Sequence, residues 1–551
     1  MKRYTIGIDF GTLSGRALLV DAVTGEELAT SVLEYAHGVM DEALPDGTPL
    51  PQDWALQHPR DYLSVVHATV PAVLKEAGVS PENVIGVGID FTASTLLPVT
   101  EDGTPLCFLE EYKSEPHAYA KLWKHHSPQE QAARMTRIAK ERGEAWLENY
   151  GGKVSSEWTL PKLLETLEEA PGLCEAAYAF VEAGDWLVWQ LTGVRTYNAC
   201  AAGYKAQWSK QEGFPSREYL SALHPGLADL AYDKMFLPPL AMGSKAGELT
   251  ERVAAMCGLC PGTAVAAANI DAHAGVPAAG IDGPGKMLAI VGTSTCHMVL
   301  GCENKPVPGI CGSPEDGLLP GYFGYEAGQT CVGDGFAWFN ENCLPASYVL
   351  EAAADGVNIH AYLREKASAL RPGESGLLAL DWFNGNRSIL VDADLSGMIL
   401  GLTLQTKPEE IYRALLEATA YGTRMIIENY RAHGVEVNEF YATGGIARKD
   451  PLMMQIYADV LRMPVHVVGS QQGPALGSAM YAAVAAGEEK GGYADIASAV
   501  RALAPKQTVL YTPVEENAAV YDVLFEEYRR LHDYFGRGGA DTMKTLKKLR
   551  A

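Results

Sequence analysis

A glycine-threonine turn between two apolar strands occurs twice in this chain, about half a chain apart. The first copy is Ile6-Gly7-Ile8-Asp9-Phe10-Gly11-Thr12, followed by Ser14 and Arg16, and the second runs from Ala289 through Gly292-Thr293 to Thr295. Glycine leaves backbone N–H groups open to an anion because no side chain stands in the way. Two such turns facing each other would hold one polyphosphate from both sides, which predicts two similar halves around a nucleotide.

Two charged side chains accompany the first turn. Asp9 has no acidic counterpart in the second copy, and Arg16 follows the turn closely. A carboxylate oxygen suits Mg²⁺, which keeps much of its hydration shell, so Asp9 is the predicted magnesium residue, acting through water. Arg16 is expected to add positive charge near the β-phosphate. A single turn of this kind would be read as a plain hairpin, whereas two copies favour phosphate binding.

Length and charge exclude several classes of protein. A chain of 551 residues is too long for one core, which predicts several domains or two large ones. With 68 acidic and 44 basic residues, the net charge of −24 argues against general affinity for nucleic acid or an anionic membrane. The ten cysteines are scattered, which is typical of a reduced cytoplasmic protein. The sequence begins with a predicted strand, which predicts no signal peptide, and no apolar run reaches the roughly 20 residues that span a bilayer.

Hydrophobic periodicity and helix-end signals predict alternating strands and helices, which is typical of an α/β protein. The predicted strands are 4–10, 16–21, 27–35, 84–89, 286–291, 297–301, 439–443 and 464–468, and the predicted helices include 59–77, 158–169, 330–340, 451–461 and one from 477. Capping boxes are predicted at Ser127 with Glu130 and at Thr406 with Glu409, the latter opening a long amphipathic helix. The tail 536–551 is expected to be solvated or frayed.

The pattern restarts after residue 285, which predicts an N-terminal domain over 1–282 and a C-terminal domain over 283–551. The segment from Gly280 to Met287 nearly matches a P-loop but has methionine where a hydroxyl is needed, and a strand follows it instead of a helix. We interpret this segment as the turn between the two domains.

Asp271 follows the apolar run 264–268 at the end of a predicted strand, beside the turn between domains. A carboxylate there can act as a general base that takes a proton from an attacking hydroxyl. The alternative is an N-cap for the following helix, and one residue can serve both roles. His273 is interpreted as a packed histidine beside the site.

Three further features point to ligand binding. Gly444 and Gly445 end a strand and permit close approach of a flat ring such as adenine, although a simple strand-to-helix turn is the alternative. Lys205 is a lone cation among small and aromatic residues, and Glu326 is a lone acid in an apolar stretch. Both suit a polyhydroxylated substrate, which needs charged hydrogen-bond partners and aromatic walls. A structural ion pair or a solvated side chain is the alternative for each.

In their order, these motifs resemble the ATPase fold shared by actin, hexokinase and the heat-shock chaperone ATPases, and within it the FGGY carbohydrate kinases. Residues 397–402 and 410–417 are similar to the C-terminal signature of that family, and 158–163 and 185–193 to its N-terminal half. The resemblance implies two actin-like (ribonuclease H-like) α/β domains with a catalytic cleft between them. It implies that Asp271 is the catalytic base and that Ala93, Lys205 and Glu326 also contact the sugar. The residues that it places around ATP are Gly11, Thr12, Ser14, Arg16, Gly292, Thr293, Gly333, Gly444 and Gly445.

Segments 54–59, 90–94, 202–206, 325–329 and 381–387 look like the subgroup of this family that phosphorylates ribulose. That resemblance implies Mg²⁺- and ATP-dependent phosphorylation of L-ribulose, and of D-ribulose as well, at the 5-hydroxyl, in L-arabinose catabolism. The alternatives are a related kinase for xylulose or another polyol and, with less support, an actin- or chaperone-like ATPase switch. A homodimer is a possible assembly. At Asp450 many family members carry Asn, so no adenine contact is assigned there.

Overall fold

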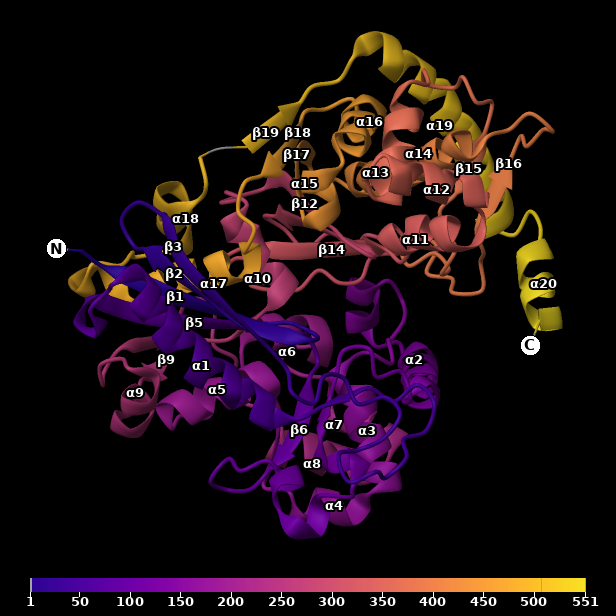
Figure 1. Cartoon of the computed structure of the whole chain (residues 1–551). Helices are drawn as coiled ribbons and strands as arrows, with labels where there is room; N and C mark the ends of the chain where they lie inside the picture. Colours follow the sequence, from indigo (N-terminus) through magenta and orange to yellow (C-terminus); the bar gives the residue numbers. More distant parts are fainter. Residues whose placement is uncertain (1, 507, 551) are drawn as a thin grey trace.

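The computed structural model describes residues 2–506 and 508–550, which form two large β-sheets with helices around them (Figure 1). The first sheet has the order β3-β2-β1-β5-β10-β9, with β11 beside β5. Its strands are β1 (Tyr4–Phe10), β2 (Ser14–Asp21), β3 (Glu27–Glu34), β5 (Val84–Phe91), β9 (Lys245–Glu248), β10 (Ala264–Ala266) and β11 (Asn269–Ile270).

The second sheet has the order β14-β13-β12-β17-β18-β19. Its strands are β12 (Gly285–Val291), β13 (Thr295–Gly301), β14 (Phe323–Gln329), β17 (Val437–Thr443), β18 (Val465–Val468) and β19 (Thr508–Tyr511). Both sheets have the same order of strand directions. Three antiparallel strands form one side (β3-β2-β1 and β14-β13-β12), two strands pair in parallel beside β1 or β12, and an antiparallel strand forms the far edge. The predicted α/β fold with two similar halves is therefore confirmed, and both Gly-Thr turns occupy the same place in their sheets.

Smaller sheets extend each half. The first half carries the order β4-β7-β6-β8, and the second half carries the pair β15-β16. These strands are β4 (Leu56–Gln57), β6 (Leu96–Val99), β7 (Ala120–Lys121), β8 (Ala179–Glu182), β15 (Leu378–Leu380) and β16 (Met398–Leu400).

The helices cover the faces of the sheets. Those of the first half are α1 (Pro59–Ala77), α2 (Gln129–Arg142), α3 (Thr159–Glu169), α4 (Pro171–Ala176), α5 (Ala183–Thr192), α6 (Ala199–Ala206), α7 (Arg217–Leu223), α8 (Leu227–Lys234), α9 (Glu251–Cys257) and α10 (Asp271–Ala278). Those of the second half are α11 (Gly333–Asn342), α12 (Ala346–Ala354), α13 (Ile359–Ser368), α14 (Pro408–Ala432), α15 (Gly445–Lys449), α16 (Pro451–Leu461), α17 (Gly473–Lys490), α18 (Ile496–Leu503), α19 (Glu515–Gly536) and α20 (Thr542–Arg550).

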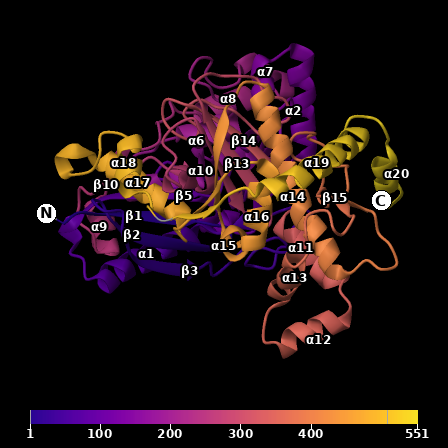
Figure 2. The same cartoon turned by 90° about the horizontal axis from the view of Figure 1, so that it is seen from above.

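Two late helices lie against the first sheet. α17 packs on β1 and β5, and α18 lies beside it, so the gold helices stand next to the indigo strands in both views (Figures 1 and 2). Gly7 and Gly88 allow this approach, since a Cβ atom there would lie 1.7 Å from the Ala475 carbonyl oxygen and 2.0 Å from that of Ser478. The boundary predicted between residues 282 and 283 falls between α10 and β12. It stays a prediction, because α17 follows this boundary in the chain but packs on the sheet of the first half.

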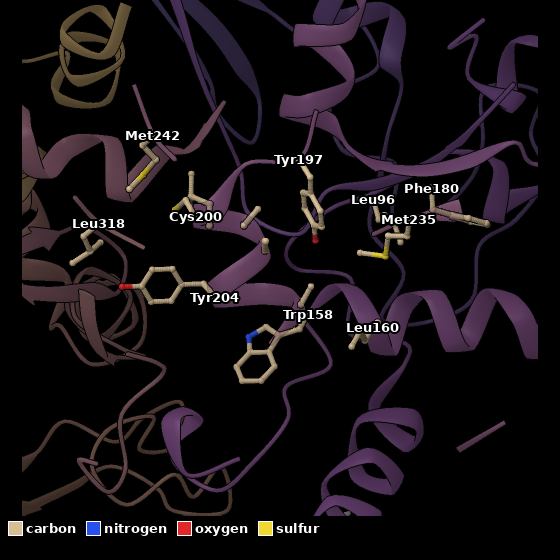
Figure 3. Packing of buried hydrophobic residues seen from close by; sticks show 14 of the residues in the cluster. Leu96, Trp158, Leu160, Phe180, Tyr197, Cys200, Tyr204, Met235, Met242 and Leu318 are labelled. Atoms are coloured by element: carbon tan, nitrogen blue, oxygen red, sulfur yellow. The ribbon is translucent and has the colours of Figure 1, made fainter. Parts of the chain in front are cut away.

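The hydrophobic core also joins the halves. Tyr204 on α6 is fully buried, and its side chain points toward Leu318 of the second half (Figure 3). Its hydroxyl donates a hydrogen bond to the carbonyl oxygen of Gly324. Helix α6 of the first half is thereby packed directly on the second half.

Most predicted elements are confirmed, and α1 and α16 have the predicted bounds. The capping box at Ser127 is wrong: Pro128 is the N-cap of α2 and makes no side-chain cap, while the Ser127 amide bonds the Asp53 carbonyl. The capping box at α14 is shifted by one residue from the prediction. The N-cap is Lys407 instead of Thr406, and the Lys407 amide donates to the carboxylate of Glu410 instead of Glu409.

The tail is helical instead of frayed in the part that the structure describes, although most of its side chains are exposed, as a solvated tail predicts. Residues 542–550 form α20, in which Met543 is buried and Lys544 pairs with Asp392 at 2.7 Å. Within the described residues, no helix combines the length and the apolar character that crossing a membrane requires.

Candidate functional site

Polar residues stand in register at the carboxyl end of the first sheet. Asp9 on β1 lies opposite Asp90 on β5, and Asp90 lies opposite Asn269 on β11. The strands are parallel here, so their ends and the groups that follow them gather at one edge. Asp271 follows Ile270, the last residue of β11, and is therefore carried to the same edge.

Asp271 is the first residue of α10, and Ile270 precedes it as the N-cap. The alternative that Asp271 itself is the N-cap residue is therefore wrong. The carboxylate nonetheless accepts a hydrogen bond of 2.6 Å from the Ala272 amide. Burial and the charge of Asp9 raise the pKa of Asp271 to about 7, against the opposing effects of the Ala272 amide and Lys205. A partly exposed carboxylate with a pKa near neutrality suits a general base.

Asp9 and Arg16 form an ion pair beside the first Gly-Thr turn. Arg16 Nε lies 3.4 Å from Asp9 Oδ2, and Arg16 Nη2 donates to Ser14 Oγ at 3.2 Å. Burial raises the pKa of Asp9, while Arg16 and Asp90 oppose the rise. Among the described residues, no group of three or more His, Cys, Asp or Glu side chains is arranged to hold a metal ion. A lone carboxylate still fits Mg²⁺, which is commonly held by one or two carboxylates, water and substrate phosphates.

The first turn is open on its outer side. Gly11 donates its amide to the Ser14 carbonyl at 3.0 Å, and the Thr12 hydroxyl accepts from the Trp123 indole at 3.1 Å. Gly11 does not have the positive φ that favours glycine, and a Cβ there would meet only the Ser14 oxygen, at 3.4 Å. Neither a positive φ nor close packing therefore requires glycine at this position.

The second turn joins two other predicted nucleotide segments. The Gly333 amide donates to the Gly292 carbonyl at 3.0 Å, and the Val332 amide donates to that of Thr293 at 2.8 Å. A Cβ at Gly333 would lie 2.8 Å from the Gly292 oxygen, and one at Gly444 would lie 2.3 Å from the Val291 oxygen. Gly445 is exposed, with no atom within 4 Å of a Cβ. The structure thus brings together Gly292, Thr293, Gly333, Gly444 and Gly445, but no hydrogen bond between described residues connects them to Gly11 or Thr12.

Lys205 and Glu326 meet across the two halves. The Lys205 ammonium lies 4.0 Å from Glu326 Oε2, and His273 Nε2 lies 3.2 Å from the same oxygen. Burial opposes ionisation of Glu326, but Lys205 and His273 outweigh it and hold the pKa of this carboxyl below its usual range. His273 is buried between Glu326 and the Cys200 thiol, 3.0 Å from its Nδ1, as the packed interpretation predicts.

A cavity of about 280 Å³ opens beside this pair. Its walls come from both halves and include Lys205 and Glu326, the aromatic rings of Tyr150 and Trp158, and the charged side chains of Glu157 and Arg387. Charged groups with aromatic walls are the surroundings expected for a sugar. Sequence reasoning assigned no role to Glu157 or Arg387, because nothing local to either segment indicates that they meet.

Ala93 lies in the turn between β5 and β6 and is partly exposed. Its neighbour Ser94 has φ 54°, and the Ser94 carbonyl accepts a 2.7 Å hydrogen bond from the ammonium of Lys162. The same ammonium donates to the Leu122 carbonyl at 2.8 Å. Burial lowers the pKa of Lys162 to about 7. Lys162 therefore connects the Ala93 turn to the segment that carries Trp123, the partner of Thr12.

Two other carboxylates have hydrogen-bond partners in separate parts of the molecule. Asp90 is fully buried and accepts a 2.6 Å hydrogen bond from Ser478 on α17. Sequence reasoning gave Asp90 no role of its own, although it ends an apolar strand. Asp450 caps α16 by accepting from the Met453 amide at 2.9 Å.

Comparisons with known proteins cover nearly the whole chain. The model of the FGGY family of carbohydrate kinases, N-terminal domain, matches residues 4–277, and the C-terminal domain model of the same family matches residues 287–486. A ribulokinase of Bacillus licheniformis is 56% identical over 539 residues, 98% of each chain. A ribulokinase of Mycolicibacterium smegmatis is 48% identical over all of this chain and 97% of its own.

Solved structures agree on the fold. A xylulose kinase from Rhodospirillum rubrum superposes with a TM-score of 0.77 at 23% identity, over 96% of this chain and 98% of its own. A glycerol kinase from Plasmodium falciparum, crystallised with ADP, gives 0.73 at 15% identity, over 96% and 98%. With two domain models in the predicted order and relatives similar from end to end, this chain belongs to the FGGY family of carbohydrate kinases.

Proposed function

We propose that this protein transfers the γ-phosphoryl group of ATP to the 5-hydroxyl of ribulose, with L-ribulose the first candidate and D-ribulose the second. The observation that carries the proposal is the similarity over almost the whole chain to proteins named ribulokinase. These relatives favour neither a kinase for xylulose or another polyol nor an ATPase switch. The cavity between the halves supports a small polar acceptor.

Asp271 is the proposed general base. Its carboxylate takes the proton of the 5-hydroxyl while the sugar oxygen attacks the γ-phosphorus, and the bond from that phosphorus to the bridging oxygen breaks. ADP leaves with the bond electrons, and the proton remains on Asp271. Such transfers need positioning and charge stabilisation more than covalent chemistry from the protein. A pKa of about 7 leaves much of Asp271 ionised at neutral pH.

The nucleotide is proposed to lie between the two Gly-Thr turns. Amides and hydroxyls at Gly11, Thr12, Ser14, Gly292 and Thr293 would hold phosphate oxygens, and Arg16 would offset their charge. Gly333, Gly444 and Gly445 would lie beside the rest of ATP. Asp9 would hold Mg²⁺ through water, and the bound ion would neutralise charge on the phosphates.

The sugar is proposed to contact Ala93, Lys205 and Glu326. Lys205 donates and ionised Glu326 accepts, so the pair can bind neighbouring hydroxyls. Because the two residues belong to different halves, bound sugar would hold the halves together and exclude the water that competes as phosphoryl acceptor. The reaction would belong to L-arabinose catabolism. Cytoplasmic location and a homodimer remain predictions.

An ADP-release assay tests the proposal. The protein with Mg-ATP is offered L-ribulose, D-ribulose, L- and D-xylulose, ribitol and glycerol, with a reaction lacking sugar as control. Preference for the ribuloses is expected, and NMR of the product should place the phosphate on O5. Preference for xylulose or glycerol would overturn the substrate assignment.

A further inference from the structure

A buried histidine joins the carboxylate of Glu326, in the second half, to the helix that carries the proposed base. His273 lies on α10, two residues after Asp271, and its Nε2 is 3.2 Å from Oε2 of Glu326 on β14. Its Nδ1 is 3.0 Å from the thiol sulfur of Cys200 on α6. Both ring nitrogens of His273 therefore have a partner inside the protein.

The chemistry of these partners determines which ring nitrogen carries the proton. Against the effect of burial, Lys205 and His273 hold the pKa of Glu326 below its usual range, so the ionised carboxylate can only accept and Nε2 must donate to it. Burial lowers the pKa of His273 more than Glu326 raises it, which keeps the imidazole neutral and leaves a lone pair on Nδ1. Burial also raises the pKa of Cys200, so the thiol keeps the proton that it can donate to that lone pair.

His273 makes the shortest of three polar contacts to the Glu326 carboxylate. The ammonium of Lys205 is 4.0 Å from Oε2, which is too long for a hydrogen bond, and the thiol of Cys296, a weak donor, is 3.6 Å from Oε1. The contact with His273 therefore restrains rotation of this carboxylate most strongly. The N–H groups of Lys205 remain available to a ligand.

The ring of His273 is also packed, so a role in shape alone is the alternative. Its centroid lies 4.3 Å from that of Tyr204, at an interplanar angle of 33°, and Tyr204 belongs to α6 with Cys200 (Figure 3). A phenyl ring could fill the same space and keep this contact, but it could neither donate to Glu326 nor accept from Cys200. Substitution can therefore separate the two roles.

We propose that His273 is a positioning residue for sugar binding: its Nε2–H holds the Glu326 carboxylate in the orientation that accepts hydrogen bonds from the sugar, and the Cys200 thiol holds the ring by donating to Nδ1. Because His273 and Asp271 share α10, the same contact sets where this carboxylate of the second half lies relative to the proposed base of the first half. The inference rests on the proposed function, since Glu326 orients a sugar only if the protein binds one.

Two substitutions separate donation from packing. His273→Gln keeps a side-chain N–H donor and loses the ring, whereas His273→Phe keeps the ring and loses the donor. His273→Phe should raise KM for ribulose roughly 10- to 100-fold, the range for a hydrogen bond to a charged group. Its kcat and its KM for ATP should stay within about threefold, because a contact made equally in the ground and transition states affects KM. His273→Gln should keep all three quantities within about threefold.

His532 on α19 provides the matched control. It is equally buried and its Nδ1 lies 3.0 Å from the Asp533 carboxylate, but it does not line the cavity. His532→Phe and His532→Gln should leave KM for ribulose unchanged, and thermal unfolding checks that all four variants are folded. A KM that is normal in His273→Phe, or raised equally in His273→Phe and His273→Gln, would overturn the proposal.

Nitrogen-15 NMR of the histidine-labelled protein at pH 7 tests the contact without substrate, with the His273 signals assigned by their absence from His273→Gln. The proton is expected on Nε2 and not on Nδ1. A proton on Nδ1, alone or together with one on Nε2, would overturn the proposal, because Cys200 could then not donate to that nitrogen. A wild type that does not phosphorylate ribulose would instead overturn the proposed function, and the spectrum would still report the contact.

Discussion

The ammonium of Lys205, on α6 of the first half, lies 4.0 Å from the carboxylate of Glu326, on β14 of the second half. Both groups are nearly buried, with side-chain exposures of 13% and 9%, and His273 contacts the same carboxylate. Burial would lower the pKa of Lys205, but Glu326 and Glu157 outweigh it and raise that pKa. The two halves therefore meet through a charged pair, Lys205 and Glu326, beside a cavity. The hydroxyl groups of a bound sugar could form hydrogen bonds with both members of this pair.

Replacing the proposed base should stop phosphoryl transfer without removing the nucleotide site. Asp271→Asn is expected to lower kcat roughly 10²- to 10⁴-fold, the usual contribution of general-base catalysis. Nucleotide affinity, measured by calorimetry, should stay within a few fold. Asp229→Asn, at an exposed position of α8, is the matched control and should retain full activity. Wild-type turnover by Asp271→Asn would remove this residue from the reaction.

Activity should depend on pH through the same carboxyl. The base must be ionised, and burial with the neighbouring Asp9 raises the pKa of Asp271 to about 7, so kcat/KM for ribulose should fall as pH drops below 7. A slope of one on the acidic side is expected, because one proton inactivates the group. A profile that stays level through pH 7 and falls only near the ordinary pKa of an aspartate, about 3.9, would contradict this assignment.

Two adjacent glycines should respond differently to alanine. At Gly444, φ is 103° and a Cβ would lie 2.3 Å from the Val291 oxygen, so Gly444→Ala should lower the free energy of unfolding by at least roughly 1–3 kcal/mol. Gly445→Ala meets no atom within 4 Å and should change stability by less than about 0.5 kcal/mol.

The second variant tests the nucleotide site. If ATP approaches Gly445, the added methyl group should raise KM for ATP roughly tenfold, about 1.4 kcal/mol, while KM for the sugar stays constant. Steady-state kinetics and chemical denaturation separate the two effects. Unchanged KM for ATP in a stable Gly445→Ala would place the nucleotide elsewhere.

Lys162 should affect sugar binding without touching the sugar. Lys162→Met leaves the Ser94 and Leu122 carbonyls without their buried donor, and should lower the free energy of unfolding by roughly 1–3 kcal/mol. Because Ser94 adjoins Ala93, KM for ribulose should also rise. Lys140→Met, at an exposed position of α2, should change neither quantity. Unchanged stability and KM for Lys162→Met would show that the Ala93 turn does not need this support.

Local patterns predicted local structure well. α1 could be predicted over its full length because its start, its apolar spacing and its final Gly78 are all encoded within the segment. Helix ends that depend on the rest of the fold were missed. Ser127 does not cap α2, because its amide bonds the distant Asp53 carbonyl, and α20 is ordered by contacts such as Lys544 with Asp392.

The same limit applies to the site. Asp271 and the Gly-Thr turns follow strand ends and could be recognised within short segments. The pairing of Glu157 with Arg387, 3.2 Å apart in space, depends on how the halves pack and has no local signal. The roles of Ala93 and Gly333 came from the family resemblance alone, whereas Lys205, Glu326 and the glycine turns also had a signal in their own segments. All of these roles remain predictions.

The most direct test of this account measures ADP release from Mg-ATP with and without L-ribulose, followed by NMR of the sugar product. We predict ADP formation that requires the sugar, equals the phosphorylated sugar in amount, and yields ribulose 5-phosphate. ATP hydrolysis that proceeds equally without any sugar would contradict the account and indicate an ATPase whose cavity serves another purpose.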